Sequence, residues 1–148
     1  MMMQSLLEDF EHTIRTSYDR MTEISEAESV APTAVGKWSK KEVLGHLIDS
    51  ASNNHHRFVK AQLTDDLLLS RYEQSAWVRH QDYASEPWTE LLLLWKSFNL
   101  HLLHVASRIP KERLNTLCRY ENSESVTLGF LVEDYVVHMK HHLKQILG

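Results

Sequence analysis

The chain has 148 residues, of which 43% are hydrophobic and 24% are charged, and its formal net charge is −4. This length suits a single domain around one hydrophobic core, and the composition is that of an ordinary soluble globular protein. The negative balance argues against a nucleic-acid partner, which needs a basic footprint. The single cysteine, Cys118, excludes an internal disulfide and a cysteine-rich zinc site.

The start of the chain and its apolar runs give no sign of export or of a membrane. The first ten residues lack a basic region followed by an apolar core, so they do not form a signal peptide. The longest apolar runs, residues 67–69 and 91–95, are far too short to span a bilayer. Together with the lone cysteine, these features predict a cytoplasmic protein with no membrane partner.

Two amphipathic helices are predicted in the first part of the chain. Apolar residues recur every three to four positions from about residue 5 to residue 23, which is the pattern of a helix with one buried face. A long connection with a proline and a glycine follows, over residues 25–37. Ser39 and Glu42 then form a capping box that opens a second helix, continuing to about residue 60.

A second long connection, from Leu63 to Glu86, has poor periodicity and carries Tyr72, Trp77 and Tyr83. A long connection of this kind within a compact domain is more often functional than not. We expect it to pack over one end of the helices and to help form the mouth of a pocket, with its aromatic residues at the rim. The alternatives are a loop that covers core or one that makes a homodimer contact.

Two further helices complete the pattern. One is predicted from about residue 87 to residue 107, with Pro87 in its first turn and Ser85 as its cap. The other begins after Thr127, its predicted cap, and runs to about residue 147. No strand alternation is evident, so the sequence predicts an all-α four-helix bundle forming one domain over residues 1–148. A glycine-rich phosphate loop and a Gly-x-Ser-x-Gly elbow are both lacking, so nucleotide binding and serine catalysis have no support.

His138 and His142, in the last predicted helix, are the most informative feature of the chain. Residues four apart on a helix share a face, with Cβ atoms about 5–6 Å apart, so two neutral imidazoles can bind one divalent cation. Helical phase puts His142 within the apolar arc, His138 at its edge and His141 toward solvent. The alternative is a solvated pair that arises by chance, since the chain has ten histidines.

A third ligand has to come from another helix, and three protein ligands would leave coordination positions open for chemistry. The best-placed candidate is His46, although helical phase puts it at the polar margin of the second helix. His55 and His56 are alternatives, but they lie more than two turns further along that helix. His101 and His104 are expected to decorate the surface of the bundle.

Two segments of the chain closely resemble the DinB-like, YfiT-like superfamily. One runs from Gly36 to Asp49 and contains a Trp-Ser-x-x-Glu motif followed by a histidine. The other, from Asp134 to Ile146, contains a His-x-x-His-His-x-x-Gln motif. The resemblance spans nearly the whole chain and is not to DNA polymerases. It implies a four-helix bundle with an unusual connection between its first two helices, and often a homodimer.

The resemblance also implies a site and a chemistry. Many members of this superfamily bind a divalent metal through one histidine of the second helix and two of the fourth, which match His46, His138 and His142. Zinc or nickel are the first candidates and iron or copper are alternatives, because imidazole donors suit all four. The implied activities on a small-molecule substrate are those of a transferase or isomerase that uses a low-molecular-weight thiol, or of a metal-dependent hydrolase.

Catalytic residues beyond the metal ligands are not identified by the sequence. A hydrolase needs a general base near the metal, and Asp49 and Asp134 are the candidates. With Tyr135 and Gln145, these residues could instead orient the imidazoles, or Tyr135 could be a core aromatic. A fold does not determine function, so a non-catalytic dimeric module that binds a metal or a small molecule is the alternative.

Overall fold

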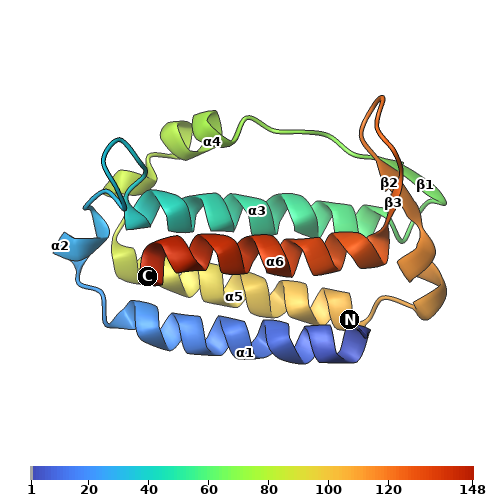
Figure 1. Ribbon diagram of the computed structural model, residues 1–148, viewed down its shortest axis with the longest axis horizontal. Coiled ribbons are helices and arrows are strands. Elements are labelled where there is room, and N and C mark those ends of the chain that lie inside the picture. Colours follow the sequence, from blue (N-terminus) through green and yellow to red (C-terminus); the bar gives the residue numbers. More distant parts are fainter. Residues whose placement is uncertain (1) are drawn as a thin grey trace.

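A computed structural model describes residues 2–148, and it consists of four long helices packed side by side (Figure 1). The helices are α1 (Met3–Thr22), α3 (Lys40–Lys60), α5 (Trp88–Ser107) and α6 (Leu128–Leu147). Helices α1 and α6 run in one direction and α3 and α5 in the other. Helix α3 packs against α5 and α6, and so does α1. The predicted all-α four-helix bundle with long connections is therefore confirmed.

The predicted caps of two helices are confirmed and a third is wrong. The Ser39 hydroxyl accepts a hydrogen bond from the Glu42 amide, and the Glu42 carboxylate accepts one from the Ser39 amide. Thr127 caps α6 by accepting from the amide of Phe130. Ser85 does not cap α5, because it lies in a 3-10 helix, Tyr83–Ser85, and its hydroxyl bonds to Asp82 instead.

The first connection contains a short helix, α2 (Glu26–Ser29), where only a loop was expected. Glu26 anchors α2 to two long helices: its carboxylate pairs with the buried Lys41 ammonium of α3 and accepts from the amide of Trp88 at the start of α5. A buried lysine needs such a partner to remain charged. This contact holds the first connection against the end of the bundle where α3 begins (Figure 1).

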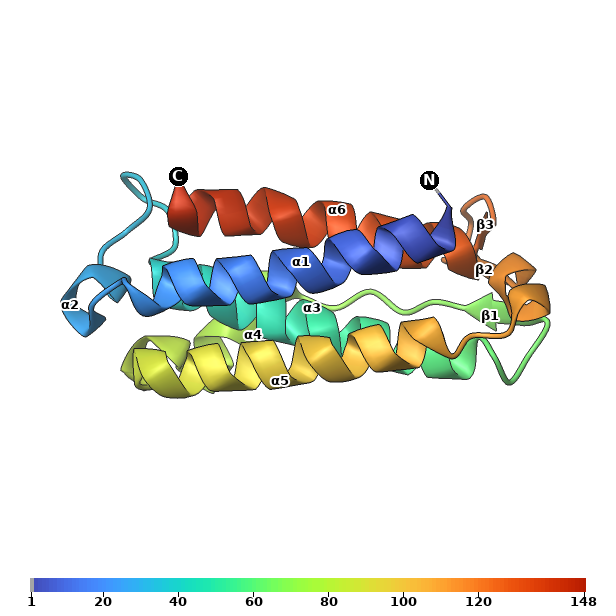
Figure 2. The same cartoon turned by 90° about the horizontal axis from the view of Figure 1, so that it is seen from below.

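The second connection runs along α3 instead of packing over one end of the bundle, which corrects the expectation from the sequence (Figures 1 and 2). It contains a strand, β1 (Asp66–Leu68), and a helix, α4 (Gln74–Gln81). β1 pairs in parallel with β2 (Leu117–Arg119), which pairs antiparallel with β3 (Val126–Thr127). These strands were not predicted, because two or three residues are too few to show alternation. A second 3-10 helix, Lys111–Asn115, precedes β2.

The core lies between the four long helices, where their apolar faces meet. Burial of these faces, more than the helix propensity of any one segment, stabilises a bundle of this kind. None of the helices within residues 2–148 combines the length and apolarity needed to cross a membrane. The largest fully buried side chains are those of Phe10, Ile14, Met21, Leu44, Leu47, Phe58, Trp88, Leu91, Leu92, Trp95, Leu102 and Leu128.

Candidate metal centre

Three histidines meet between α3 and α6. His46 comes from the first half of α3, and His138 and His142 lie one turn apart on α6. One ring nitrogen from each lies within 4.8 Å of the others, and the Nε2 atoms of His138 and His142 are 3.1 Å apart. Within residues 2–148, this is the only group of three or more histidine, cysteine or acidic side chains whose donor atoms lie so close together. The structure thus brings together all three histidines selected from the sequence.

The surroundings of His46 fit a metal ligand. Its side chain is 1% exposed, and neither ring nitrogen has a hydrogen-bond partner within residues 2–148. Leaving a buried polar group unpaired costs about 1–3 kcal/mol, and a coordinated cation would remove part of that cost. Burial, with His142 and His138 nearby, lowers the pKa of His46 to about 4. Its imidazole is therefore neutral near pH 7, as metal coordination requires.

The spacing within the cluster is also suitable. Two nitrogens, each about 2.0–2.1 Å from one tetrahedral ion, lie about 3.3 Å apart. The observed 3.1 Å between the Nε2 atoms of His138 and His142 is close to this value. Burial and the neighbouring His142 lower the pKa of His138, and Asp134 opposes that shift. The three imidazole donors, the spacing of His138 and His142, and the lowered pKa values of His46 and His138 thus fit a divalent cation.

Helical phase did not select His46 because other segments cover α3. Every residue from Val43 to Ala51 is buried, so this stretch has no solvent-exposed face. Helices α5 and α6 cover two sides, while α4 and the 3-10 helix Tyr83–Ser85 cover another. The ring of Trp38 lies over the His46 ring with centroids 5.3 Å apart. A position at the polar margin of an isolated helix is therefore enclosed in the folded protein.

Gln145 orients one member of the cluster. The Nδ1 atom of His142 lies 2.9 Å from Oε1 of Gln145. An amide oxygen only accepts, so this contact places the His142 proton on Nδ1 and leaves the Nε2 lone pair for a metal. This is the orienting role considered for Gln145 from the sequence. Tyr135, considered for the same role, is instead a buried core residue whose hydroxyl donates to Asn99.

Asp49, one candidate for a general base, is buried and held by the second connection. Its Oδ1 accepts from the Tyr83 hydroxyl at 2.7 Å and from the Gln81 amide at 2.8 Å, while Oδ2 has no partner within residues 2–148. Burial raises the pKa of Asp49, and the two hydrogen bonds oppose that shift. Asp134, the other candidate, is exposed on α6, one turn before His138.

Tyr83 reaches Asp49 because Gly45 makes room for its ring. A Cβ atom at Gly45 would lie within 2.6 Å of three Tyr83 ring atoms, a separation that real structures do not tolerate. Tyr83 was expected at the rim of a pocket, and it is buried instead. The sequence signal that could have revealed this packing is a glycine inside a helix, directly before a candidate metal ligand.

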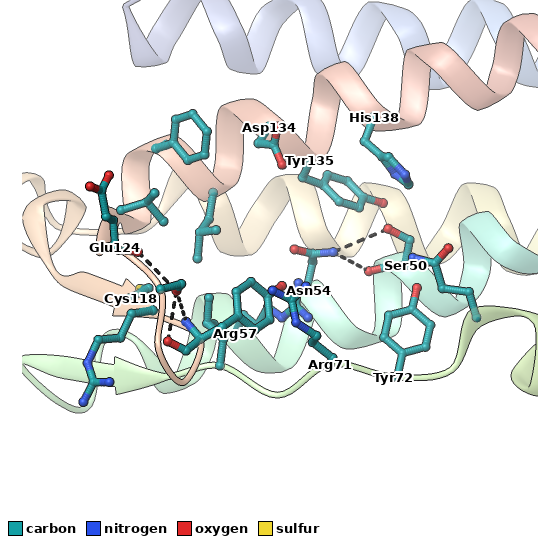
Figure 3. A pocket seen from close by; sticks show the side chains of 18 residues that line it. Ser50, Asn54, Arg57, Arg71, Tyr72, Cys118, Glu124, Asp134, Tyr135 and His138 are labelled. Carbon is teal, nitrogen blue, oxygen red and sulfur yellow. Dashed lines mark hydrogen bonds between the residues drawn. The ribbon is translucent and has the colours of Figure 1, made fainter.

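A pocket of about 450 Å³ lies beside the cluster, and His138 forms part of its wall. Its lining comes from α3, α6, the segment after β1 and the turn between β2 and β3, as Figure 3 shows. Tyr72 lines this pocket as expected, and burial raises its pKa to about 12. Trp77 does not: it is 39% exposed and lies in a separate hollow together with His56. The expected aromatic rim is thus reduced to Tyr72.

A second hollow, of about 530 Å³, reaches the cluster from its other side. His142 and Gln145 line it, together with residues of the first connection from Thr33 to Trp38. The cluster is therefore bordered by two hollows, one next to His138 and one next to His142. Such access from solvent is what a catalytic centre requires and what a closed structural site lacks.

The fold and the site define a class of protein: a four-helix bundle in which histidines converge between two of the helices. The chain belongs to the DinB superfamily, whose family model matches residues 9–146.

Several curated relatives are similar to this chain at low identity. A Geobacillus thermodenitrificans protein named "Putative metal-dependent hydrolase" is 29% identical over 121 residues, which is 79% of this chain and 66% of that protein. An Oceanobacillus iheyensis protein of the same description is 24% identical over 111 residues, covering 75% of this chain and 64% of that protein. The chain thus spans slightly under two thirds of the length of these two relatives.

Solved structures share the fold. YfiT from Bacillus subtilis, described as a probable metal-dependent hydrolase with an unusual four-helix bundle topology, superposes with a TM-score of 0.87 at 19% identity, covering 97% of this chain and 83% of that chain. A mycothiol-dependent maleylpyruvate isomerase superposes with a TM-score of 0.81 at 9% identity, covering 99% of this chain and 61% of that chain.

Proposed function

We propose that the protein is a metal-dependent hydrolase in which His46, His138 and His142 hold one divalent cation. The observation that carries the proposal is the convergence of three imidazole nitrogens, one of them buried with no other partner, beside an open pocket. The descriptions of the relatives and of the YfiT structure support the same conclusion. Zinc or nickel are the first candidates for the cation, followed by iron and copper.

His46, His138 and His142 would hold the cation, which would supply Lewis-acid chemistry that lowers the pKa of water or of a thiol. The chain's own residues arrange the surroundings. Gln145 holds the His142 ring in the tautomer whose Nε2 faces the cluster. Asp134 lies with His138 in the wall of the 450 Å³ pocket, where its carboxylate could accept a proton from a reacting group. Asp49 is engaged by Tyr83 and Gln81, so we assign it a positioning role.

The 450 Å³ pocket beside His138 suits a small-molecule substrate, since its volume falls in the usual range for such sites, about 300–1,000 Å³. A thiol-dependent transferase is the second candidate, because the cluster borders two hollows and a transfer reaction brings two molecules to one centre. We also propose a homodimer, and size-exclusion chromatography with light scattering tests that part separately. A non-catalytic binding module remains the alternative if no reaction is found.

Elemental analysis of the purified protein is the first test. We expect close to one equivalent of a divalent metal in the wild type and loss of that metal in His46→Ala, with His101→Ala as the matched control at an exposed histidine. Metal-loaded and metal-free protein are then compared on ester and amide substrates, with and without low-molecular-weight thiols. Activity that needs metal but no thiol supports the hydrolase, and activity that needs both supports the transferase. A His46→Ala variant that retains its metal would overturn the proposed centre.

A further inference from the structure

Two arginines and a tyrosine form a second polar cluster in the 450 Å³ pocket, away from the histidines. The guanidinium carbon of Arg71 lies 4.0 Å from the centre of the Tyr120 ring, and that of Arg57 lies 5.7 Å from it. All three residues line the same pocket as His138. They come from three parts of the chain: Arg57 from the last turn of α3, Arg71 from the segment after β1, and Tyr120 from the residue after β2.

Neither guanidinium is neutralised by the protein. Within residues 2–148, no carboxylate oxygen lies within 4.0 Å of Arg57 or Arg71, whereas Arg119, the third arginine of the pocket, pairs with Asp66 at 3.7 Å. Arg57 donates one hydrogen bond to the carbonyl of Ser70 at 3.0 Å, which fixes its direction and leaves further donors available. The two acidic residues of the pocket, Glu124 and Asp134, are not paired with either arginine.

The chemistry of this cluster identifies the group that it can bind. A guanidinium offers a planar fork of donors that matches a carboxylate or a phosphate, and such charge-assisted bonds are stronger than neutral ones. Tyr120 provides an aromatic face that holds Arg71 in place. Two unpaired guanidinium groups beside one ring therefore form a preorganised site for an anion.

The same helix face leads from this cluster to the histidines. His46, Ser50, Asn54 and Arg57 follow each other along α3 at spacings of three and four residues, and the last three of them line the pocket (Figure 3). At about 1.5 Å per residue, His46 and Arg57 are separated by roughly 16 Å along the helix axis, and the long arginine side chain spans part of that distance. A ligand that contacts both ends is thus an elongated small molecule.

We infer that Arg57 and Arg71 bind the anionic group, a carboxylate or a phosphate, of an elongated small molecule whose opposite end lies at His138. The placement of the reacting end rests on the proposed function. The binding of the anion does not, because it needs only the arginines and the pocket. Whether the bound anion is a carboxylate or a phosphate, the substrate carries a negative charge remote from the bond that reacts.

Calorimetric titration of metal-free and metal-loaded protein tests this inference. Glutarate, inorganic phosphate and the neutral diamide glutaramide serve as probes. We expect glutarate or phosphate to bind even without metal, and glutaramide not to bind. Tighter binding of glutarate indicates a carboxylate site, and tighter binding of phosphate indicates a phosphate site. Arg71→Gln should weaken anion binding by about tenfold or more, the loss of a hydrogen bond to a charged group. Arg108→Gln, the control at an exposed position of equal charge, should change it little.

Arg57→Gln would also remove the hydrogen bond to the Ser70 carbonyl, so Arg71→Gln is the decisive variant. The melting temperature and metal content of Arg71→Gln are measured in parallel. Unchanged metal content with weakened anion binding supports the inference. If neither anion binds the wild type, or if Arg71→Gln binds as the wild type does, the inference is wrong even when the metal centre is real. Failure of the metal centre would appear differently, as protein that binds the anion and takes up no metal.

Discussion

Helix α3 carries two clusters of histidines, and the difference between them shows what makes such a cluster a metal site. In the first, the His46 ring lies with its centroid 4.7 Å from that of His142. In the second, the His55 ring lies 5.3 Å from that of His101 and 6.0 Å from that of His56. The rings are nearly as close in the second cluster, but their nitrogen atoms do not converge within the 4.8 Å that joins the first.

Burial separates the two clusters. His46 is enclosed where several elements cover α3, whereas His56, His101 and His104 are exposed on α3 and α5. Exposed imidazoles obtain hydrogen bonds from water, so they need no further partner. The buried His46 has none within residues 2–148. Converging ring nitrogens, one pair of which belongs to a buried imidazole without a hydrogen-bond partner, therefore identify the candidate centre better than proximity of rings does.

The largest expected effect is the loss of metal binding when a proposed ligand is replaced, and it tests the contrast between the two histidine clusters. We expect His46→Ala to weaken metal binding at least about a hundredfold, because loss of even an outer partner of a ligand costs 10–100-fold. His55→Ala, the matched change on the same helix, should leave metal content unchanged. Competition titration with a chromogenic chelator measures both. Loss of metal in the His55 variant would show that the second cluster is the site.

The same variant tests how the fold is stabilised. Metal-free protein and His46→Ala should both remain helical by circular dichroism at room temperature, because the apolar faces of four helices dominate folding. An unfolded metal-free protein would instead identify a structural metal site.

The enclosure of the first cluster can be altered through Gly45. Gly45→Ala should lower the free energy of unfolding by about 1–3 kcal/mol, since the added methyl group overlaps the Tyr83 ring and overpacks the site. Gly129→Ala is the matched control, because the nearest atom to its added Cβ is at 3.4 Å and alanine favours the helix. Urea unfolding measures both variants. Equal stability of Gly45→Ala and the wild type would show that Tyr83 does not press on α3.

A smaller effect is expected at Asp49, next to the buried cluster. Burial raises the pKa of Asp49, so the unfolded chain releases this proton at lower pH than the native protein, and ionisation favours unfolding as the pH rises. In metal-free protein at pH 7, Asp49→Asn should keep both acceptor contacts and gain up to about 1 kcal/mol of stability. The gain should shrink as the pH falls and the wild-type carboxyl is protonated. A clear loss of stability at pH 7 would contradict this.

The smallest effect is expected at Trp77, which lies in a hollow with His56 on the side of the second cluster. Trp77→Ala should leave metal content and ligand binding unchanged. Its oligomeric state is measured by light scattering, since dissociation into monomers would assign Trp77 to a subunit interface. Weakened metal binding would instead place Trp77 at the centre, contrary to its position in the structure.

Local signals predicted most of the fold and part of the site. Apolar periodicity predicts each long helix, and the capping box at Ser39 predicts the residue at which α3 begins. His138 and His142 could be paired because helical spacing alone sets their distance. The burial of His46 could not be predicted from its own helix, since Trp38 and the second connection enclose it.

The arginine cluster could not be predicted from the sequence either, because its contacts also come from separate segments of the chain. Arg71 and Tyr120 are brought together by the pairing of β1 with β2, about fifty residues apart in the chain, and Arg57 reaches them from α3. Strands of two or three residues leave no periodic pattern in the sequence. Contacts made within one helix turn can be read from the sequence, whereas contacts made through a short sheet depend on the completed fold.

The small sheet has a mechanical consequence for the pocket. β1 precedes Arg71, β2 precedes Tyr120, and β3 leads directly into α6, while the amide of Leu69 donates to the carbonyl of Arg119 and extends the ladder. Hydrogen bonds between three strands therefore hold this wall of the pocket together, and β3 joins it to α6. Backbone amides of this wall should exchange with deuterium together, as one cooperative unit. A ligand that needs more room at the strands then has to displace β1, β2 and β3 together.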